Sequence, residues 1–373
     1  MRPSPGGHLV RLRRGTVVGV RGERRGALLL SVLLRPEGLV VDALAYPGLV
    51  GPVAPGDEVV LNTTARALGL GTGGFDLVMA VVGGPETELD HPGRMMKLRY
   101  TPAQAAVVGV EETHRDALEA SPGLAGTPVV AAPLHSMIAH AAAGAKAAGA
   151  ERVVYVMTDG AALVGALSEL VPQLRTAGML DGFVTCGQAL GGELEAATLW
   201  TGLLAAREVL GADAIVVADG PGNLGTGTRW GVSALASGHA LNAAEALGGR
   251  PVAALRVSFA DRRERHRGVS HHSITILGHV ALVRANVAVP VLEGAEREAV
   301  WAALRAAGLE ERHQLVEDQG RPALERLAEA SVDVRSMGRT AADDPAFFLA
   351  AGAAGVLAGR MAAGTRRWRG GEA

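Results

Sequence analysis

Short apolar runs, separated by turn residues, fill the first part of the chain. Pro55-Gly56-Asp57 is one such turn, because proline presets one backbone angle and glycine accepts the next. Strand-length runs at this spacing are typical of a small antiparallel barrel or sandwich. The runs rich in Val and Leu are Val10–Val20, Ala27–Leu34, Leu39–Ala45, Glu58–Asn62 and Phe75–Val82. We therefore expect residues 1–88 to form a β-rich, barrel-like module.

From Thr127 onward, apolar runs alternate with longer stretches of helical pattern. Repeated strand–helix units predict a mostly parallel sheet, and near-continuous apolar strands indicate burial on both faces. The runs are Pro128–Pro133, Arg152–Met157, Phe183–Thr185, Ala214–Val217, Val252–Phe259, Val287–Leu292 and Gln314–Val316. We expect a doubly wound α/β domain over residues 127–364, after a connector over 89–126 and before a flexible tail over 365–373. A (β/α)₈ barrel is the alternative, although its eighth strand, near Val332–Val334, is weak.

Composition narrows the class of protein. The chain has 373 residues, a formal net charge of −2 and 3% aromatic residues, which gives little attraction to nucleic acid and few rings for base stacking. The single cysteine, Cys186, excludes an internal disulfide and a cysteine-rich metal site. We find no secretory leader and no apolar run of about 18–20 residues. We therefore expect a cytoplasmic protein without a membrane or nucleic-acid partner. A homo-oligomer is compatible with the sequence.

Polar side chains follow the predicted strands of the α/β domain. His135 comes after the first strand, Asp159 after the second and Asp219 after the fourth. The carboxyl ends of parallel strands share one edge of a sheet, and ligands of open α/β sheets bind outside that edge. We therefore expect a ligand site there, although loops are polar in any protein.

A glycine-rich segment follows the fourth strand of this domain. Its glycines match a G-x-G-x-x-G pattern, in which backbone N–H groups approach a phosphate at a helix N-terminus. Pro221 removes one donor, and no acidic residue ends the next strand as a dinucleotide site needs. Anion binding and a plain tight turn therefore both fit the segment. The ligand-binding candidates are Gly220, Gly222, Gly225, Thr226, Gly227 and Thr228.

Histidines and arginines gather between Asp261 and His279. Ser270 is well placed to cap a helix, which would put His271 and His272 in the first turn, where the helix dipole favours neutral imidazole. Neutral imidazole can act as a base or ligate a metal. The histidines that we consider catalytic are His266, His271 and His272. The alternative is a solvated basic loop followed by a capped helix.

Aspartates are the candidate partners of these three histidines, and we expect at least one to share a cleft with them. Asp159 and Asp261 would take part in acid–base chemistry, because a carboxylate orients an imidazole and raises its basicity. His271 and His272 together with Asp219 could hold a divalent metal ion. Each aspartate could instead cap its own loop.

Four further side chains are candidates for lesser roles. Arg267 and His135 could contact an anionic ligand. Lys97 is one of only two lysines among 36 basic residues, and lysine serves as a point charge for phosphate; a plain surface lysine is the alternative. Cys186 ends a strand, and we expect it to be structural because a buried thiol contributes packing.

Specific motifs are spread along nearly the whole chain. They are His91-Pro92-Gly93, Met96–Pro102, Leu134-His135-Ser136, Thr158–Ala161, Gly220–Thr228, Arg265–His272, Met337-Gly338-Arg339 and Asp344–Phe348. In these motifs the chain resembles a bacterial family described only as a domain of unknown function. The resemblance implies a soluble bacterial protein, and it brings no activity and no catalytic residue. It speaks against an ordinary dehydrogenase or kinase.

The patterns together predict an enzyme that acts on a small anionic or phosphorylated metabolite. A hydrolase or transferase would use histidine–aspartate acid–base chemistry or a divalent metal ion. The alternative is a regulatory protein that binds a small molecule in the same place without turning it over. Histidines clustered with a carboxylate favour the enzyme, whereas histidines used up in structural hydrogen bonds favour the regulatory protein.

Overall fold

The computed structural model describes residues 8–24, 26–70 and 73–370, with side chains up to residue 365. The chain divides into two compact units. The first comprises Met1–Pro92 with Tyr100–Ala105, and the second Gly93–Arg99 with Ala106–Ala373. Of the tail expected over residues 365–373, residues 365–370 continue the last helix, and 371–373 lie outside the described residues.

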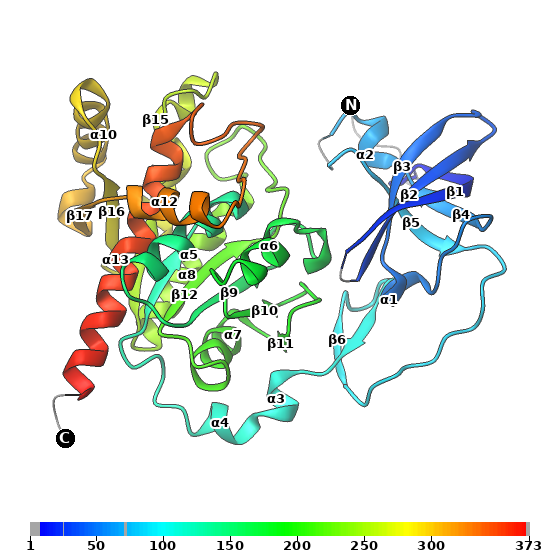
Figure 1. Ribbon diagram of the computed structural model, residues 1–373, viewed down its shortest axis with the longest axis horizontal. Helices are drawn as coiled ribbons and strands as arrows, with labels where there is room; N and C mark the ends of the chain where they lie inside the picture. Colours follow the sequence, from blue (N-terminus) through cyan, green and yellow to red (C-terminus); the bar gives the residue numbers. More distant parts are fainter. Residues whose placement is uncertain (1–7, 25, 71–72, 371–373) are drawn as a thin grey trace. The chain divides into compact units, whose positions relative to one another are not determined.

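The first unit is a closed barrel of five strands in the order β1-β2-β3-β5-β4 (Figure 1). Each predicted apolar run forms one strand, and side chains such as Leu30, Val32 and Leu61 fill the interior. The expected antiparallel arrangement is wrong for one pair, because β3 and β5 run parallel. The elements are β1 (Leu12–Arg24), β2 (Ala27–Arg35), β3 (Val40–Ala45), α1 (Pro47–Val50), β4 (Glu58–Asn62), α2 (Thr64–Ala67) and β5 (Asp76–Val81).

The second unit is built on an eight-stranded parallel sheet in the order β11-β10-β9-β12-β8-β13-β16-β17. This open sheet confirms the predicted α/β class and excludes the (β/α)₈ alternative. Its strands are β8 (Pro128–Ala131), β9 (Val153–Thr158), β10 (Gly182–Cys186), β11 (Leu194–Ala196), β12 (Ala214–Asp219), β13 (Arg250–Ala254), β16 (Asn286–Pro290) and β17 (Gln314–Asp318). The short edge strand β11 was not predicted, because three residues carry no readable pattern.

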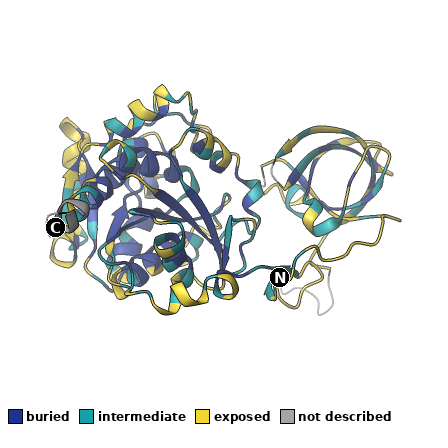
Figure 2. Ribbon diagram, turned by 60° about the horizontal axis from the view of Figure 1, so that its bottom comes forward, coloured by how far each residue is buried: buried dark blue, intermediate teal, exposed yellow. Residues whose placement is uncertain are grey.

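Helices cover both faces of this sheet. Alternate strand residues enter two separate cores: Tyr155 and Val216 pack with α5, α12 and α13, whereas Val154 and Ile215 pack with α7, α8 and α10. The central strands of the sheet are accordingly buried (Figure 2), whereas the edge strand β17 is partly exposed. The helices are α3 (Val110–Thr113), α4 (Arg115–Glu119), α5 (Ile138–Ala147), α6 (Leu170–Thr176), α7 (Leu199–Leu204), α8 (Ala236–Ala246), α9 (His271–Thr275), α10 (Gly294–Ala306), α11 (Leu309–Arg312), α12 (Arg321–Glu329) and α13 (Pro345–Gly370). A short ribbon joins β6 (Met95–Lys97) to β7 (Ala105–Val107).

The sheet has a topological switch point between β8 and β12. The helix after β8 is α5, which lies on one face, and the helix after β12 is α8, which lies on the other. Two neighbouring parallel strands whose connections diverge in this way leave a crevice beyond their carboxyl ends, where open α/β sheets bind ligands.

Helix α13 corrects one expectation from the sequence. Residues Pro345–Thr365 are long and apolar enough to cross a membrane, with a mean hydropathy of 1.6, so an apolar run of that length does exist. In the folded domain 78% of the most apolar 18-residue stretch of this helix is buried, because small side chains let α13 lie in the core. Such a core helix is consistent with a soluble protein.

Helix α13 packs so closely against α5 that several glycines at the contact, Gly355 among them, tolerate no side chain. A β-carbon on Gly355 would lie 2.1 Å from the Ala141 carbonyl oxygen. We predict that Gly355→Ala lowers the free energy of unfolding by about 1–3 kcal/mol, because backbone atoms of α5 cannot move aside. Urea unfolding of the full chain measures this change. Gly364→Ala is the matched control in the same helix: it meets open space and should stabilise slightly by reducing backbone entropy, so equal effects of the two changes would contradict the prediction.

Candidate functional site

The candidate site is built by the chain that follows β13. After β13, the strands β14 (Val257–Ser258) and β15 (Gly268–Val269) form an antiparallel ribbon, with the 3₁₀ turn Glu264–His266 between them, and α9 follows directly. The Ser270 side chain accepts a hydrogen bond from the backbone N–H of His272 at 3.3 Å. This confirms the predicted helix cap, which fixes His271 and His272 in the first turn of α9.

Three histidines meet at this point. One ring nitrogen from each of His266, His271 and His272 lies within 4.8 Å of those from the other two. His266 and His272 are buried, and His271 is half-buried. The Nδ1 atom of His266 is 2.8 Å from the Ser270 hydroxyl. The Nε2 atom of His271 is buried and has no hydrogen-bond partner among the residues that the structure describes, which is costly unless a ligand completes the site.

The histidines are held in the neutral form. Desolvation lowers the pKa of His266 to about 3, with Arg256 and Arg263 adding to the effect. Desolvation also lowers the pKa of His272 to about 4, and it lowers the pKa of His271 together with the charge of Arg265. The neutral form was expected, but its main causes are burial and neighbouring charge, rather than the helix dipole. At neutral pH each imidazole therefore offers a lone pair for a metal or a proton.

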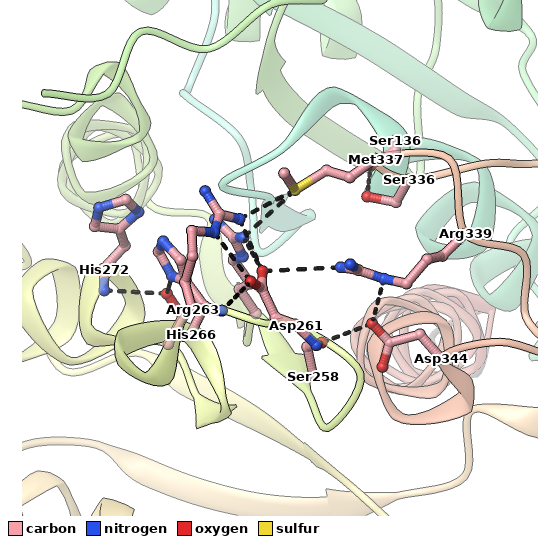
Figure 3. Close-up of polar contacts among 12 residues, drawn as sticks. Ser136, Ser258, Asp261, Arg263, His266, His272, Ser336, Met337, Arg339 and Asp344 are labelled. Atoms are coloured by element: carbon pink, nitrogen blue, oxygen red, sulfur yellow. Dashed lines mark hydrogen bonds and ion pairs between the residues drawn. The ribbon is translucent and has the colours of Figure 1, made fainter. Parts of the chain in front are cut away.

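Asp261 is the centre of an ion-pair network beside the histidines (Figure 3). Its carboxylate accepts hydrogen bonds from Arg263 at 2.8 and 2.9 Å and from Arg256 at 3.2 Å, and Arg339 lies 3.8 Å away. The hydrogen bonds from Arg263 hold the pKa of Asp261 well below its usual range. The catalytic role expected for Asp261 is therefore corrected: its oxygens are taken by guanidinium groups, so it fixes arginines rather than moving protons.

A second carboxylate extends this network to the start of α13. Asp344 accepts hydrogen bonds from the Ser258 hydroxyl at 2.6 Å and from Arg339 at 3.1 Å. Arg339 thus bridges Asp344 and Asp261. The chain after α12 is thereby fixed to the ribbon that carries the histidines.

Asp159 and Asp219 belong to a different place, at the ends of the neighbouring strands β9 and β12. The Asp219 carboxylate accepts from the Thr158 hydroxyl at 2.6 Å and from the Gly160 N–H at 3.1 Å, and burial raises its pKa. Asp159 is exposed and accepts from the Gln188 N–H at 2.8 Å. Among the described residues, neither makes a hydrogen bond or ion pair with the three histidines. The expected roles of Asp159 as their catalytic partner and of Asp219 as a metal ligand are therefore corrected, because these carboxylates cap turns at the switch point.

His135 also lies at the switch point, in a structural role. Its Nε2 atom is 2.8 Å from the Ser168 hydroxyl and its Nδ1 atom is 3.2 Å from the Tyr155 hydroxyl. Desolvation lowers its pKa to about 4. Both ring nitrogens are thus engaged, which leaves none for the anion contact expected of His135.

The glycine-rich segment is a loop between β12 and α8 at the carboxyl edge, as predicted, but it does not open the helix. Gly225 pairs with Val232 in a small hairpin, and Thr226 donates its N–H to the Gly231 carbonyl at 2.8 Å. The helical turn begins only at Ser233, so a phosphate cradle at a helix N-terminus is wrong here. The hairpin approaches the histidine segment at its tip, where the Arg265 guanidinium lies 4.0 Å from where a β-carbon of Gly227 would be.

Of three other candidates, Lys97 is displaced, Arg267 stays a prediction and Cys186 is supported. The ligand contact expected for Lys97 is corrected: its ammonium group is fully buried and donates to the Ala189 and Ala196 carbonyls at 2.8 and 3.0 Å, beside Glu195. Arg267 is exposed beside β15. Cys186 is buried, and desolvation raises its pKa to about 12, which agrees with a structural thiol. Two surface hollows lie on the barrel and are not lined by the histidines, and the cleft expected around the histidines stays a prediction.

Arg256, Arg339 and Met337 belong to the site, although the sequence analysis gave none of them a role there and named Met337 and Arg339 only in a motif of the family resemblance. Arg256 interrupts the apolar run from Val252 to Phe259, and a charge inside a buried run was the available signal. Arg339 and Met337 reach the site only through tertiary packing of the segment after α12, which no local pattern reveals.

Fold and site together define a two-unit protein: a five-stranded barrel precedes a doubly wound α/β domain that carries a histidine–arginine cluster beyond β13. Residues 42–355 match the family described as a protein of unknown function, DUF3866. This match spans most of the chain, so the chain belongs to that family. No curated protein and no solved structure matches the chain.

Removing the charge of Asp261 tests whether its network holds the site together. We predict that Asp261→Asn lowers the free energy of unfolding by about 3–5 kcal/mol, because buried guanidinium groups lose their counter-charge. Asp333→Asn is the control, since Asp333 pairs with Arg335 in solvent and its loss should cost less than about 1 kcal/mol. Chemical denaturation of both variants measures these changes. Similar small losses of unfolding free energy in the two variants would show that the network is dispensable.

Proposed function

We propose that the protein is a metal-dependent enzyme, and most simply a hydrolase, that acts on a small anionic metabolite. The observation that carries this proposal is the convergence of three neutral imidazoles in the α/β unit. Three protein ligands with an open fourth position are typical of catalytic zinc sites, and imidazole is a preferred ligand of zinc. The unpartnered Nε2 atom of His271 supports the same conclusion.

The surroundings favour an anionic substrate. Arg256, Arg263 and Arg265 all act on the histidines, since each lowers the pKa of at least one of them. Their charge opposes a bare cation, and it attracts the anion that would balance a metal ion. A divalent ion at the histidines would therefore be bound best together with a negatively charged ligand.

A metal ion at this place would supply two effects. Held by His266, His271 and His272, it would make a water molecule more acidic near neutral pH and would neutralise charge that develops on the substrate. In the hydrolysis of a phosphate ester, the water oxygen bonds to phosphorus, the bond to the leaving alcohol breaks, and the alcohol takes up a proton. The arginines would hold the phosphoryl oxygens during this step.

A bacterial cytoplasmic setting is part of the proposal. The unpaired and buried Cys186 fits a reducing compartment, and the buried course of α13 fits a soluble protein.

Metal titration tests the proposal. After removal of bound metals with a chelator, we expect the full-length protein to take up one Zn²⁺ per chain, measured by calorimetry and elemental analysis. His271→Ala and His272→Ala should each weaken this binding by about 100-fold or more, because each removes one of three ligands. His239→Ala is the control, since His239 is an exposed histidine on α8.

An assay of phosphate-ester hydrolysis is the second test of the proposed function. We expect slow hydrolysis of small phosphate esters that is lost with the chelator and returns with the metal. Absence of metal uptake by the wild-type chain, or equal uptake by His271→Ala, contradicts the proposal. Metal and phosphate binding without turnover would instead favour the regulatory alternative.

A further inference from the structure

Two buried or half-buried guanidinium groups face a thioether in this site. The Met337 sulfur lies 3.2 Å from a terminal nitrogen of Arg263 and 3.8 Å from one of Arg256 (Figure 3). A thioether is a weak acceptor, whereas guanidinium groups pair best with carboxylate or phosphate oxygens. Two cationic donors thus converge on one of the poorest acceptors that a protein offers.

Arg256 is the less satisfied of the two. It is buried, with 6% of its surface exposed, and its Nε atom has no hydrogen-bond partner among the described residues. A buried guanidinium with an idle N–H costs free energy unless a ligand pairs with it.

The charges of the network do not balance. Three arginines, Arg256, Arg263 and Arg339, share two carboxylates, Asp261 and Asp344. One guanidinium charge of this network is therefore left without a carboxylate of its own. A bound anion would restore neutrality at this point.

Met337 is held over the arginines in a strained conformation. Its φ of +51° is unusual for a residue with a side chain, and it is 60% exposed. The turn that carries it is closed by pairing of Ser336 with Arg339, and the Ser336 hydroxyl is 2.9 Å from that of Ser136 after β8. Strain of this kind persists where the surroundings impose it, and it gathers at functional sites.

We propose that Arg256 and Arg263 form a subsite for the phosphate group of the substrate, and that Met337 is a displaceable cover that occupies this subsite when no ligand is bound. The phosphate oxygens take the place of the Met337 sulfur, and the two guanidinium groups gain strong acceptors. The catalytic role of the subsite rests on the proposed function, whereas its affinity for phosphate does not, because the arginines act without a metal ion.

Inorganic phosphate is the probe, and the metal-free full-length protein is the sample. Calorimetry should show binding that Arg263→Gln weakens by about ten-fold or more, as expected for loss of a charge-assisted hydrogen bond. Met337→Ala should tighten binding several-fold, because the competing group is gone. Arg335→Gln is the control, since Arg335 is exposed and pairs with Asp333. Arg263 is chosen because its side chain is 37% exposed, so its variant should fold.

Methyl NMR reports on the cover directly. With labelled methionine methyl groups, phosphate should shift the signal of Met337 far more than those of the other eight of the nine methionines, with Met337→Ala assigning it. Unchanged phosphate affinity in both Arg263→Gln and Met337→Ala, with a static Met337 signal, overturns the subsite. If zinc still binds at the histidines in that case, the proposed function survives; if phosphate binds as stated but zinc does not, the subsite stands and the proposed function falls.

Discussion

The carboxylate of Asp261 is the interaction on which the site depends. It gathers guanidinium groups from the segment after β13 and from the turn before β15, which are close to it in sequence, and from the segment after α12, which is distant in sequence. Through Arg339 and Asp344 the same network reaches the start of α13. Because α13 lies in the core against α5, the position of the arginines is set by the packing of the whole α/β unit. The buried carboxylate of Asp261 thus fixes the positions of three arginine side chains on the α/β unit.

The positive charge of the arginines has two opposite effects on metal binding by the histidines. The arginine charge and burial keep the imidazoles neutral, which makes their lone pairs available. The same charge repels a metal cation, so metal binding and anion binding should support each other. In thermodynamic terms the two ligands are coupled, and each should raise the affinity of the site for the other. A protein that must bind a metal and an anionic metabolite together would gain selectivity from this arrangement.

Much of the fold followed from local patterns, whereas the composition of the site did not. The barrel strands and the buried strands of the sheet were readable because their apolar runs have strand length and end at turn residues. The Ser270 cap was also predictable, because it is local. The neutral state of His271 was expected from the helix dipole, whereas its main causes are burial and the charge of Arg265. Lys97 was misleading because its rarity suggested a ligand contact, yet it satisfies two backbone carbonyls in the core. The partners of the histidines could not be predicted: Asp159, Asp219 and Asp261 all follow strands of one domain, and only the packing after α12 brings Arg339 to Asp261.

The proposed function requires that three imidazoles of one chain hold a metal ion. X-ray absorption at the zinc edge of the reconstituted protein tests it most directly, because scattering from imidazole rings identifies histidine ligands and counts them. We expect three imidazole nitrogens at about 2.0–2.1 Å with the remaining position taken by oxygen. A spectrum with sulfur ligands, or with oxygen ligands and no imidazole scattering, would exclude a metal site at these histidines.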